Sequence, residues 1–274
     1  MNDFIEFFQG LENRPLQRFA FFIAGMMVLW ILEGSIPLLS LKYRKTKWKH
    51  GMVNLGFTAI HFIIHTIFAI FILMISDWCK NQGFGLIYWL DSGLWASIII
   101  VSLCLDFCGG WLVHIIEHKI PVLWNIHVIH HSDNKVDVTT GLRHHPLESI
   151  LRGMFFLLGV VISGAPMFTV MIFQTLLVFF TTLTHANIKL PTWLDKTISF
   201  VLVSPNMHKV HHHWKQPYTD SNYGAVFSIW DIILGKFKSL DISSLKYGLD
   251  RYYPNEKDED IVSLMKAPFR KMES

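Results

Sequence analysis

Long apolar runs alternate with short polar segments along most of this chain. The first three runs cover residues 17–40, 52–76 and 93–113, and the first is interrupted only by Arg18 and Glu33. Each is long enough to cross a bilayer, which takes about 20 mainly apolar residues in a helix. A carboxylate is costly in hydrocarbon, so we expect Glu33 to face protein or to lie near an interface. The pattern predicts three membrane-spanning helices.

A fourth apolar region, residues 151–184, is divided by the sequence Ser163-Gly-Ala-Pro166. Gly and Pro interrupt a helix strongly, so the region is predicted to form a hairpin of two helices that enters and leaves by one face. This return matters because clusters of histidine precede and follow the region. A single span here would place those clusters on opposite sides of the membrane.

Composition and charge agree with a membrane protein. Hydrophobic residues make up 51% of the chain and charged residues 16%, and the net charge of +3 gives no support for binding nucleic acid. Residues 41–50 hold five basic side chains and no acidic one, which places this loop in the cytoplasm. The start of the chain lacks the basic region of a cleaved signal peptide. Three cysteines indicate no disulfide framework.

The predicted fold is therefore all-α. Residues 1–274 form a single integral membrane domain, a helical bundle of three spans plus a re-entrant helical hairpin. The polar segments at the cytoplasmic ends of the spans form a histidine-rich helical cap.

Eleven of the fifteen histidines fall in clusters at the ends of the apolar runs. The clusters have regular spacings: HxxxH at 114–118, HxxHH at 127–131, a pair at 144–145, and a second HxxHH within 208–213. On a helix, residues three and four apart share one face. The spacings thus predict helical faces that carry imidazoles on His114, His118, His127, His130, His131, His208, His211 and His212.

Eight imidazoles on three faces are too many ligands for one four-coordinate ion. Two ions can share them, with about four nitrogens each and room for water or oxygen. A lone histidine on an apolar face is usually a hydrogen-bonded core residue, but two HxxHH clusters preceded by HxxxH favour a metal centre. The cysteines lie outside the clusters, so this is not a zinc finger. By contrast, His61 and His65 within the second span are predicted to bond to neighbouring helices, with lining of a substrate path as a further role.

The order HxxxH, HxxHH, HxxHH resembles the fatty acid hydroxylase superfamily, also called the sterol desaturase family. The resemblance covers residues 106–235, which would be the catalytic region. Besides the eight histidines it includes the following matches: Glu117, Arg143-His-His-Pro146 with Glu148, His185, Pro205, Asn222-Tyr-Gly224 and Trp230-Asp-Ile-Ile-Leu-Gly235. The sequence departs from the family at Ile115, where arginine is common, and after Asp231.

The resemblance implies a non-haem di-iron enzyme that uses O₂ and two electrons to hydroxylate or desaturate a lipid C–H bond. Acid–base side chains cannot break such a bond, so a redox metal must do so. The resemblance also assigns the eight clustered histidines as metal ligands and adds His145 and His185 to them. His144 and His213 remain outside this ligand set. Asp106, Asp231 and Asn222 are expected to orient ligands, and Glu148 to bond a ligand histidine.

The implied cofactors are two iron ions, with O₂ as co-substrate, and zinc can take their place in a recombinant preparation. The implied partners are a lipid drawn from the bilayer and a separate electron donor resembling cytochrome b5, a ferredoxin or a flavoprotein. Two other classes remain open: a metal-transporting or metal-storing membrane protein, and a zinc-dependent membrane hydrolase. The first would carry ligands at mid-membrane within broken helices, whereas here the clusters flank the spans. The second would use fewer ligands and a carboxylate base.

Overall fold

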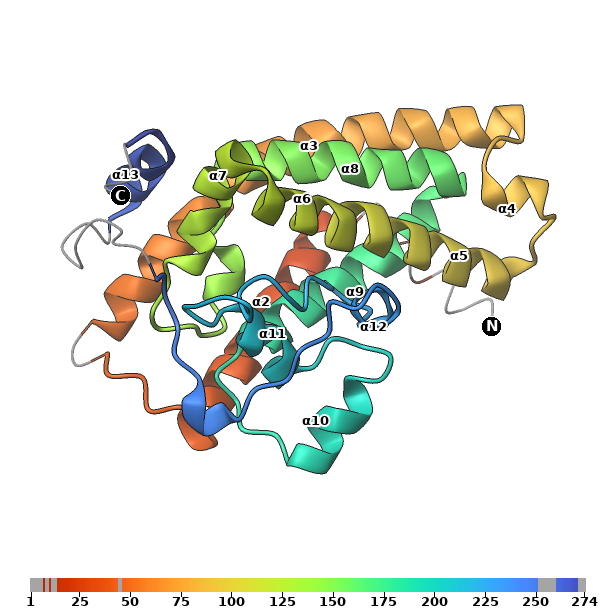
Figure 1. Ribbon diagram of the computed structural model, residues 1–274. Coiled ribbons are helices and arrows are strands. Elements are labelled where there is room, and N and C mark those ends of the chain that lie inside the picture. Colours follow the sequence, from red (N-terminus) through yellow and green to blue (C-terminus); the bar gives the residue numbers. More distant parts are fainter. Residues whose placement is uncertain (1–6, 8–9, 11–13, 44–45, 251–259, 271–274) are drawn as a thin grey trace.

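The structure, a computed structural model, describes residues 7, 10, 14–43, 46–250 and 260–270. In this part of the chain every regular element is a helix, and no strand is present (Figure 1). The predicted all-α class is therefore confirmed.

Among the described residues, four helices are long and apolar enough to cross a membrane. The second predicted span lies within α3 (Lys47–Gln82), which continues through a short turn into α4 (Leu86–Trp89). The third lies within one continuous helix made of α5 (Leu94–Asp106), η1 (Phe107–Leu112) and α6 (Val113–Lys119). The fourth region forms two helices, α8 (Pro146–Ser163) and α9 (Met167–His185).

The first predicted span differs from this set. Its helix, α2 (Pro15–Ser35), has a shorter apolar portion, Ala20–Ser35. The helix ends at Ser35 because Ile36 precedes a proline and leaves the helical conformation. Pro37 then pairs with Ile188, just beyond the end of α9. Glu33 near its end is buried, and its Oε1 accepts backbone N–H groups of Val138 at 2.7 Å and Asn187 at 2.6 Å. The expectation that Glu33 faces protein is confirmed.

The long helices alternate in direction, so all the histidine clusters meet at one end of the bundle. α3 and α8 leave this end, and α5–α6 and α9 return to it (Figure 1). At the opposite end, the α8–α9 turn is closed by Gly164 in a left-handed conformation with φ 73°. It packs against Gly85 so closely that a Cβ on Gly85 would lie 2.4 Å from Gly164. Only glycine allows this approach.

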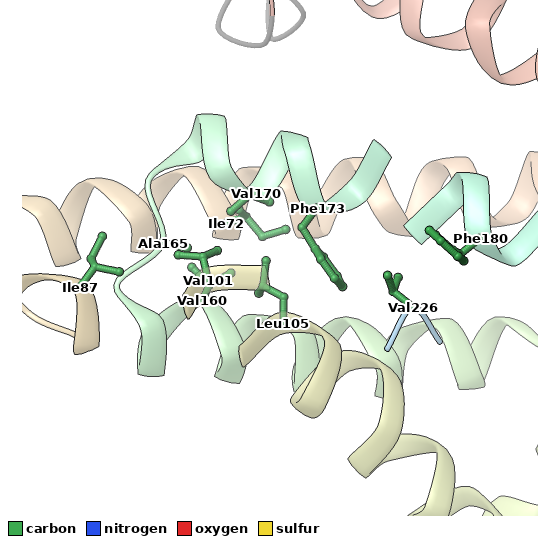
Figure 2. Close-up of a cluster of buried hydrophobic side chains, with 10 residues drawn as sticks. All are labelled: Ile72, Ile87, Val101, Leu105, Val160, Ala165, Val170, Phe173, Phe180 and Val226. Atoms are coloured by element: carbon green, nitrogen blue, oxygen red, sulfur yellow. The ribbon is translucent and has the colours of Figure 1, made fainter. Parts of the chain in front are cut away.

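Between the helices lies a core of aliphatic and aromatic side chains, shown in Figure 2. Val101 and Leu105 of α5 meet Val160 of α8 and Phe173 of α9 there. On the outward faces of the same helices, large apolar side chains such as Ile63, Ile67 and Phe71 of α3 are exposed. A helix apolar on both its inner and outer faces is typical of a membrane span.

A π-helical stretch, η1, joins α5 to α6. π-helical stretches are rare and occur often at functional sites. Gly109 and Gly110 make the stretch compact: a Cβ on Gly109 would lie 3.0 Å from Phe156, and one on Gly110 would lie 2.9 Å from Ala225. α6, with its pair of histidines, is thereby positioned against the loops that follow α11.

The histidine end is built from short elements. They are α7 (Pro121–His131), η2 (Thr140–Leu142), α10 (Thr192–Ile198), α11 (Pro205–His211), α12 (Ile229–Ile233), η3 (Ile242–Ser244), α13 (Ile261–Lys266) and η5 (Ala267–Phe269). α7, α8 and α11 each begin with proline, which is pre-set for the first turn of a helix. Ser204 also caps α11, accepting the N–H of Met207 at 3.2 Å.

Candidate metal centre

Nine histidines gather into two groups at the end of the bundle, each compact enough to hold one metal ion. In both groups the potential ligand atoms lie within 4.8 Å of one another. Group 1 comprises His114, His118, His127, His131 and His211. Group 2 comprises His130, His185, His208 and His212. The HxxHH clusters on α7 and α11 contribute to both groups, since their adjacent histidines diverge toward different centres.

The ring nitrogens within each group are close. His127 Nε2 lies 3.2 Å from His114 Nε2 and 3.1 Å from His131 Nε2 in group 1. In group 2, His185 Nε2 lies 3.1 Å from His130 Nε2, 3.0 Å from His208 Nε2 and 3.2 Å from His212 Nε2. Two nitrogens bound at about 2.0–2.1 Å and about 90° to one ion would be about 3 Å apart. The spacing fits coordination to a shared ion.

Hydrogen bonds to the other ring nitrogen define the tautomer of five of these imidazoles. Each Nδ1–H donates outward, which leaves Nε2 as a bare lone pair facing the group. The acceptors are Tyr223 O for His114 at 2.8 Å, Asp220 Oδ1 for His118 at 3.3 Å, Glu148 Oε1 for His127 at 2.9 Å, Thr181 O for His185 at 2.7 Å and Ser221 O for His211 at 2.7 Å.

This arrangement leaves lone pairs without hydrogen-bond partners. Because His114 and His127 both donate through Nδ1, neither can donate through Nε2 to the other. His118 Nε2 and His211 Nε2 are buried and have no partner among the described residues. Buried acceptors of this kind are costly unless a cation or a donor satisfies them. The residues present therefore fit metal ions.

Burial keeps the imidazoles of the two HxxHH clusters neutral. It lowers the pKa of His127 to about 3, against the opposing effect of the nearby Glu148 carboxylate. Burial, followed by repulsion from neighbouring imidazoles, also holds the pKa values of His130, His131, His208 and His212 well below their usual range. A metal ligand must be the neutral form, so these rings are ready to coordinate near neutral pH.

A buried network of charges supports His127. Glu148 on α8 accepts from His127 Nδ1, from His144 Nδ1 at 2.7 Å and from Arg152 Nε at 2.9 Å. Arg152 also forms an ion pair with Glu117 of α6. The expectation that Glu148 bonds a histidine agrees with this geometry. The role of Arg152 was not predicted, although its i, i+4 spacing from Glu148 is a signal that could have indicated it.

The side chains expected to orient the ligands bond to the backbone rather than to the histidine rings. Asp106 accepts the N–H groups of Val226 and Phe227, and Asp231 accepts those of Tyr223 and Gly224. Asn222 bonds Met207 O and Lys238 O and lies at φ 55°. None of these contacts is to a histidine ring. They instead fix the backbone of residues 221–227, whose carbonyls accept from His211 and His114.

His145 lies outside both groups. Its Nδ1 accepts the N–H of Leu147, capping α8, and its Nε2 lies 3.3 Å from the carbonyl oxygen of Met265. Both ring nitrogens have protein partners, so the structure does not bring His145 together with the other expected ligands. His185, the other expected addition, is at the centre of group 2.

The remaining histidines are peripheral to the two groups. The His144 ring stacks on His130 with centroids 4.2 Å apart, closer to the centre than expected. His61 Nε2 lies 2.9 Å from the carbonyl oxygen of His144. His61 was predicted to bond a neighbouring helix, and its partner lies instead in the loop that precedes α8. His213 stays near Lys215. Asp220, the acceptor for His118, was missed because no sequence spacing connects it to α6.

Known proteins resemble the chain in this same region. A sequence model described as fatty acid hydroxylase matches residues 98–236, which is half of the chain and contains both groups of histidines. No solved structure matches significantly.

Curated relatives are lipid-modifying enzymes by name. An ornithine lipid hydroxylase of Rhizobium tropici is 25% identical over 55% of this chain and 44% of its own length. The human alkylglycerol monooxygenase is 27% identical over 88% of this chain and 52% of its own. The human cholesterol 25-hydroxylase is 22% identical over 47% of each. The chain spans about half the length of the curated relatives it matches.

Proposed function

We propose, because this chain belongs to the fatty acid hydroxylase family, that it is a membrane-bound oxygenase that hydroxylates a lipid C–H bond at two iron ions. One oxygen atom of O₂ enters the C–H bond and the other leaves as water. Balance requires two electrons from a donor and two protons from solvent. The ornithine lipid, alkylglycerol and cholesterol in the names of its relatives indicate an amphiphilic substrate with a polar head.

One observation carries the proposal: bare imidazole lone pairs converge in two adjacent buried groups. His114, His118, His127, His131 and His211 would hold one ion, and His130, His185, His208 and His212 the other. Iron bound there would supply the redox chemistry that activates O₂. Neutral nitrogen ligands suit iron, copper and zinc, so metal identity must be measured.

The surrounding residues would keep the ligands in position. Five ligand histidines donate their Nδ1–H to protein oxygens, so each Nε2 keeps its lone pair. The acceptors are the carbonyls of Ser221, Tyr223 and Thr181 and the carboxylates of Asp220 and Glu148. Arg152 offsets the negative charge of Glu148 and Glu117. Such outer partners typically change metal affinity or activity by about 10–100-fold when removed.

We propose further that residues 1–274 form one membrane domain whose catalytic region is 106–235, with the histidine end in the cytoplasm. The basic segment 41–50 supports this orientation. α8 and α9 would enter and leave the bilayer by that same face. Electrons would then come from a cytoplasmic carrier resembling cytochrome b5, a ferredoxin or a flavoprotein, and the lipid would enter from the bilayer.

The test is turnover by the purified protein in lipid nanodiscs, loaded with iron or with zinc. An alkylglycerol, an ornithine lipid and cholesterol are supplied with a chemical reductant, and products are identified by mass spectrometry under ¹⁸O₂. Incorporation of a single ¹⁸O atom by the iron form alone supports the proposal. Hydrolysis products, or equal activity of the zinc form without O₂, would contradict it.

A further inference from the structure

Seven large apolar side chains are exposed on short elements that are not membrane spans. They lie on α10, on the turn that follows it, and on or just after α12. We refer to them as the apolar shelf: Trp193, Phe200, Val201, Ile232, Ile233, Leu234 and Phe237. Phe200 is 78% exposed, Ile233 72% and Trp193 70%. Residues of this size and exposure seldom gather on a surface that faces water.

The two parts of the shelf are held side by side. The N–H of Ser228, directly before α12, donates to Val201 O at 3.1 Å, and the N–H of Val203 donates to Val226 O at 2.9 Å. Leu202 and Phe227 pair across the same junction and pack on the core between the long helices. The shelf is therefore fixed to the bundle through the junction of residues 201–203 with residues 226–228.

The exposed charges next to the shelf are mainly basic. Lys189, Lys196 and Lys238 are exposed, whereas Asp195 and Asp231 are buried; Asp241, three residues beyond Lys238, is the exposed acidic residue on this segment. Exposed lysines beside exposed Trp, Phe and Ile are the pattern of elements that lie in a membrane interface, where lysines contact anionic head groups and apolar side chains enter about 5–10 Å.

We infer that the apolar shelf is embedded in the interfacial layer of the membrane on the histidine side, against anionic lipid. At 7 and 5 residues, α10 and α12 are too short to cross the bilayer. The shelf is attached to the long helices, because Leu202 and Phe227, its neighbours in the sequence, pack on the core between those helices. The alternative is that a second copy of the chain or another protein, rather than lipid, covers this surface.

Membrane contact at the shelf would set the height of the metal centre. α10 is connected to α11 through Ser199 Oγ and Ser204 Oγ at 2.8 Å, and through the Asn206 N–H and Asp195 Oδ1 at 3.2 Å. α11 carries His211 of group 1 and His208 of group 2. Docking of the shelf thus places the centre beside the head-group layer. This inference goes beyond lipid hydroxylation and does not depend on which metal is bound.

The experiment measures the depth of spin labels in nanodiscs of phosphatidylcholine and phosphatidylglycerol. Phe200→Cys and Ile233→Cys are made separately in a background with Cys79, Cys104 and Cys108 changed to Ala, and each is labelled with a nitroxide. Ile67→Cys on the outer face of α3 is the lipid-exposed reference, and Lys215→Cys is the water-exposed reference. Leu234→Cys replaces either shelf variant that fails to match the parent in elution and thermal unfolding.

We expect the shelf labels to collide with O₂ more than with a water-soluble nickel chelate, as at residue 67, with the reverse at residue 215. The preference should lessen when phosphatidylglycerol is left out. Ready access of the chelate to both shelf labels would overturn the inference. So would protection from both O₂ and the chelate, because that result would mean that protein rather than lipid covers the surface.

Discussion

His114 and His127 direct bare Nε2 lone pairs at each other across 3.2 Å. Each ring donates its only proton in the opposite direction, His114 to Tyr223 O and His127 to Glu148 Oε1. Two lone pairs at this distance repel unless a cation lies between them. His114 lies on α6, His127 on α7 and Glu148 on α8, so a cation bound by the two histidines would hold these three helices together. A metal centre at this place would therefore also stabilise the fold.

Glu148→Gln should weaken binding of the group 1 ion by about 10–100-fold. The amide can present an N–H where His127 needs an acceptor, and it removes a negative charge near the ion. Metal affinity is measured by competition with a chromogenic chelator. Glu33→Gln is the matched control, because Glu33 is also buried but accepts backbone N–H groups outside the centre. Equal affinity in the Glu148 variant and the parent would contradict the network.

His185→Ala should remove about half of the bound metal, because its Nε2 approaches three other ligands of group 2. His145→Ala should leave the metal content unchanged and reduce stability by about 1 kcal/mol through loss of the α8 cap. Metal analysis and thermal unfolding of both proteins check this pair. Metal loss in the His145 variant would restore the ligand role that the sequence suggested.

Gly164→Ala should destabilise the protein strongly. Its Cβ would meet Phe84 O at 2.5 Å, and φ is 73°. Gly83→Ala is the control, because Gly83 is also left-handed, with φ 59°, but a Cβ there would meet nothing within 4 Å. The control should cost about 1–2 kcal/mol and Gly164→Ala clearly more. Equal melting temperatures for the two variants would mean that the α8–α9 turn is packed differently.

Membrane orientation can be tested with an impermeant amine reagent applied to intact cells and to inverted vesicles. We expect Lys42, Lys49 and Lys215 to be modified only from the cytoplasmic side, and Lys80, at the far end of α3, only from the other side. Modification of Lys42 and Lys215 from different sides would exclude a histidine end that faces a single compartment.

Much of the centre could be predicted from the sequence because helical spacing is local. The i, i+3 and i, i+4 rule places His127, His130 and His131 near one another, and the break at Gly164 and Pro166 returns α9 to the same end. The assignment of adjacent histidines to different groups could not be predicted. It depends on how α7 and α11 pack against each other, which no local pattern contains.

The same limit explains the misses. Asp220 reaches His118 from 102 residues away, and the Tyr223 carbonyl reaches His114 from 109 residues away. Every residue has a backbone carbonyl, so the sequence does not indicate which carbonyl accepts the proton of His114. The π-helical stretch η1 lies directly before the helix that carries His114, and nothing in the apolar pattern of residues 93–113 indicates this stretch.

The central claim is tested most directly by metal content and metal–ligand spectroscopy of the protein purified without added metal. We expect about two ions per chain, mainly iron, and X-ray absorption with nitrogen neighbours at about 2.0–2.2 Å dominated by imidazole. His211→Ala and His130→Ala should each reduce that content. A chain that binds no more than one ion, or that keeps its full metal content when both histidines are replaced, would contradict a two-ion centre.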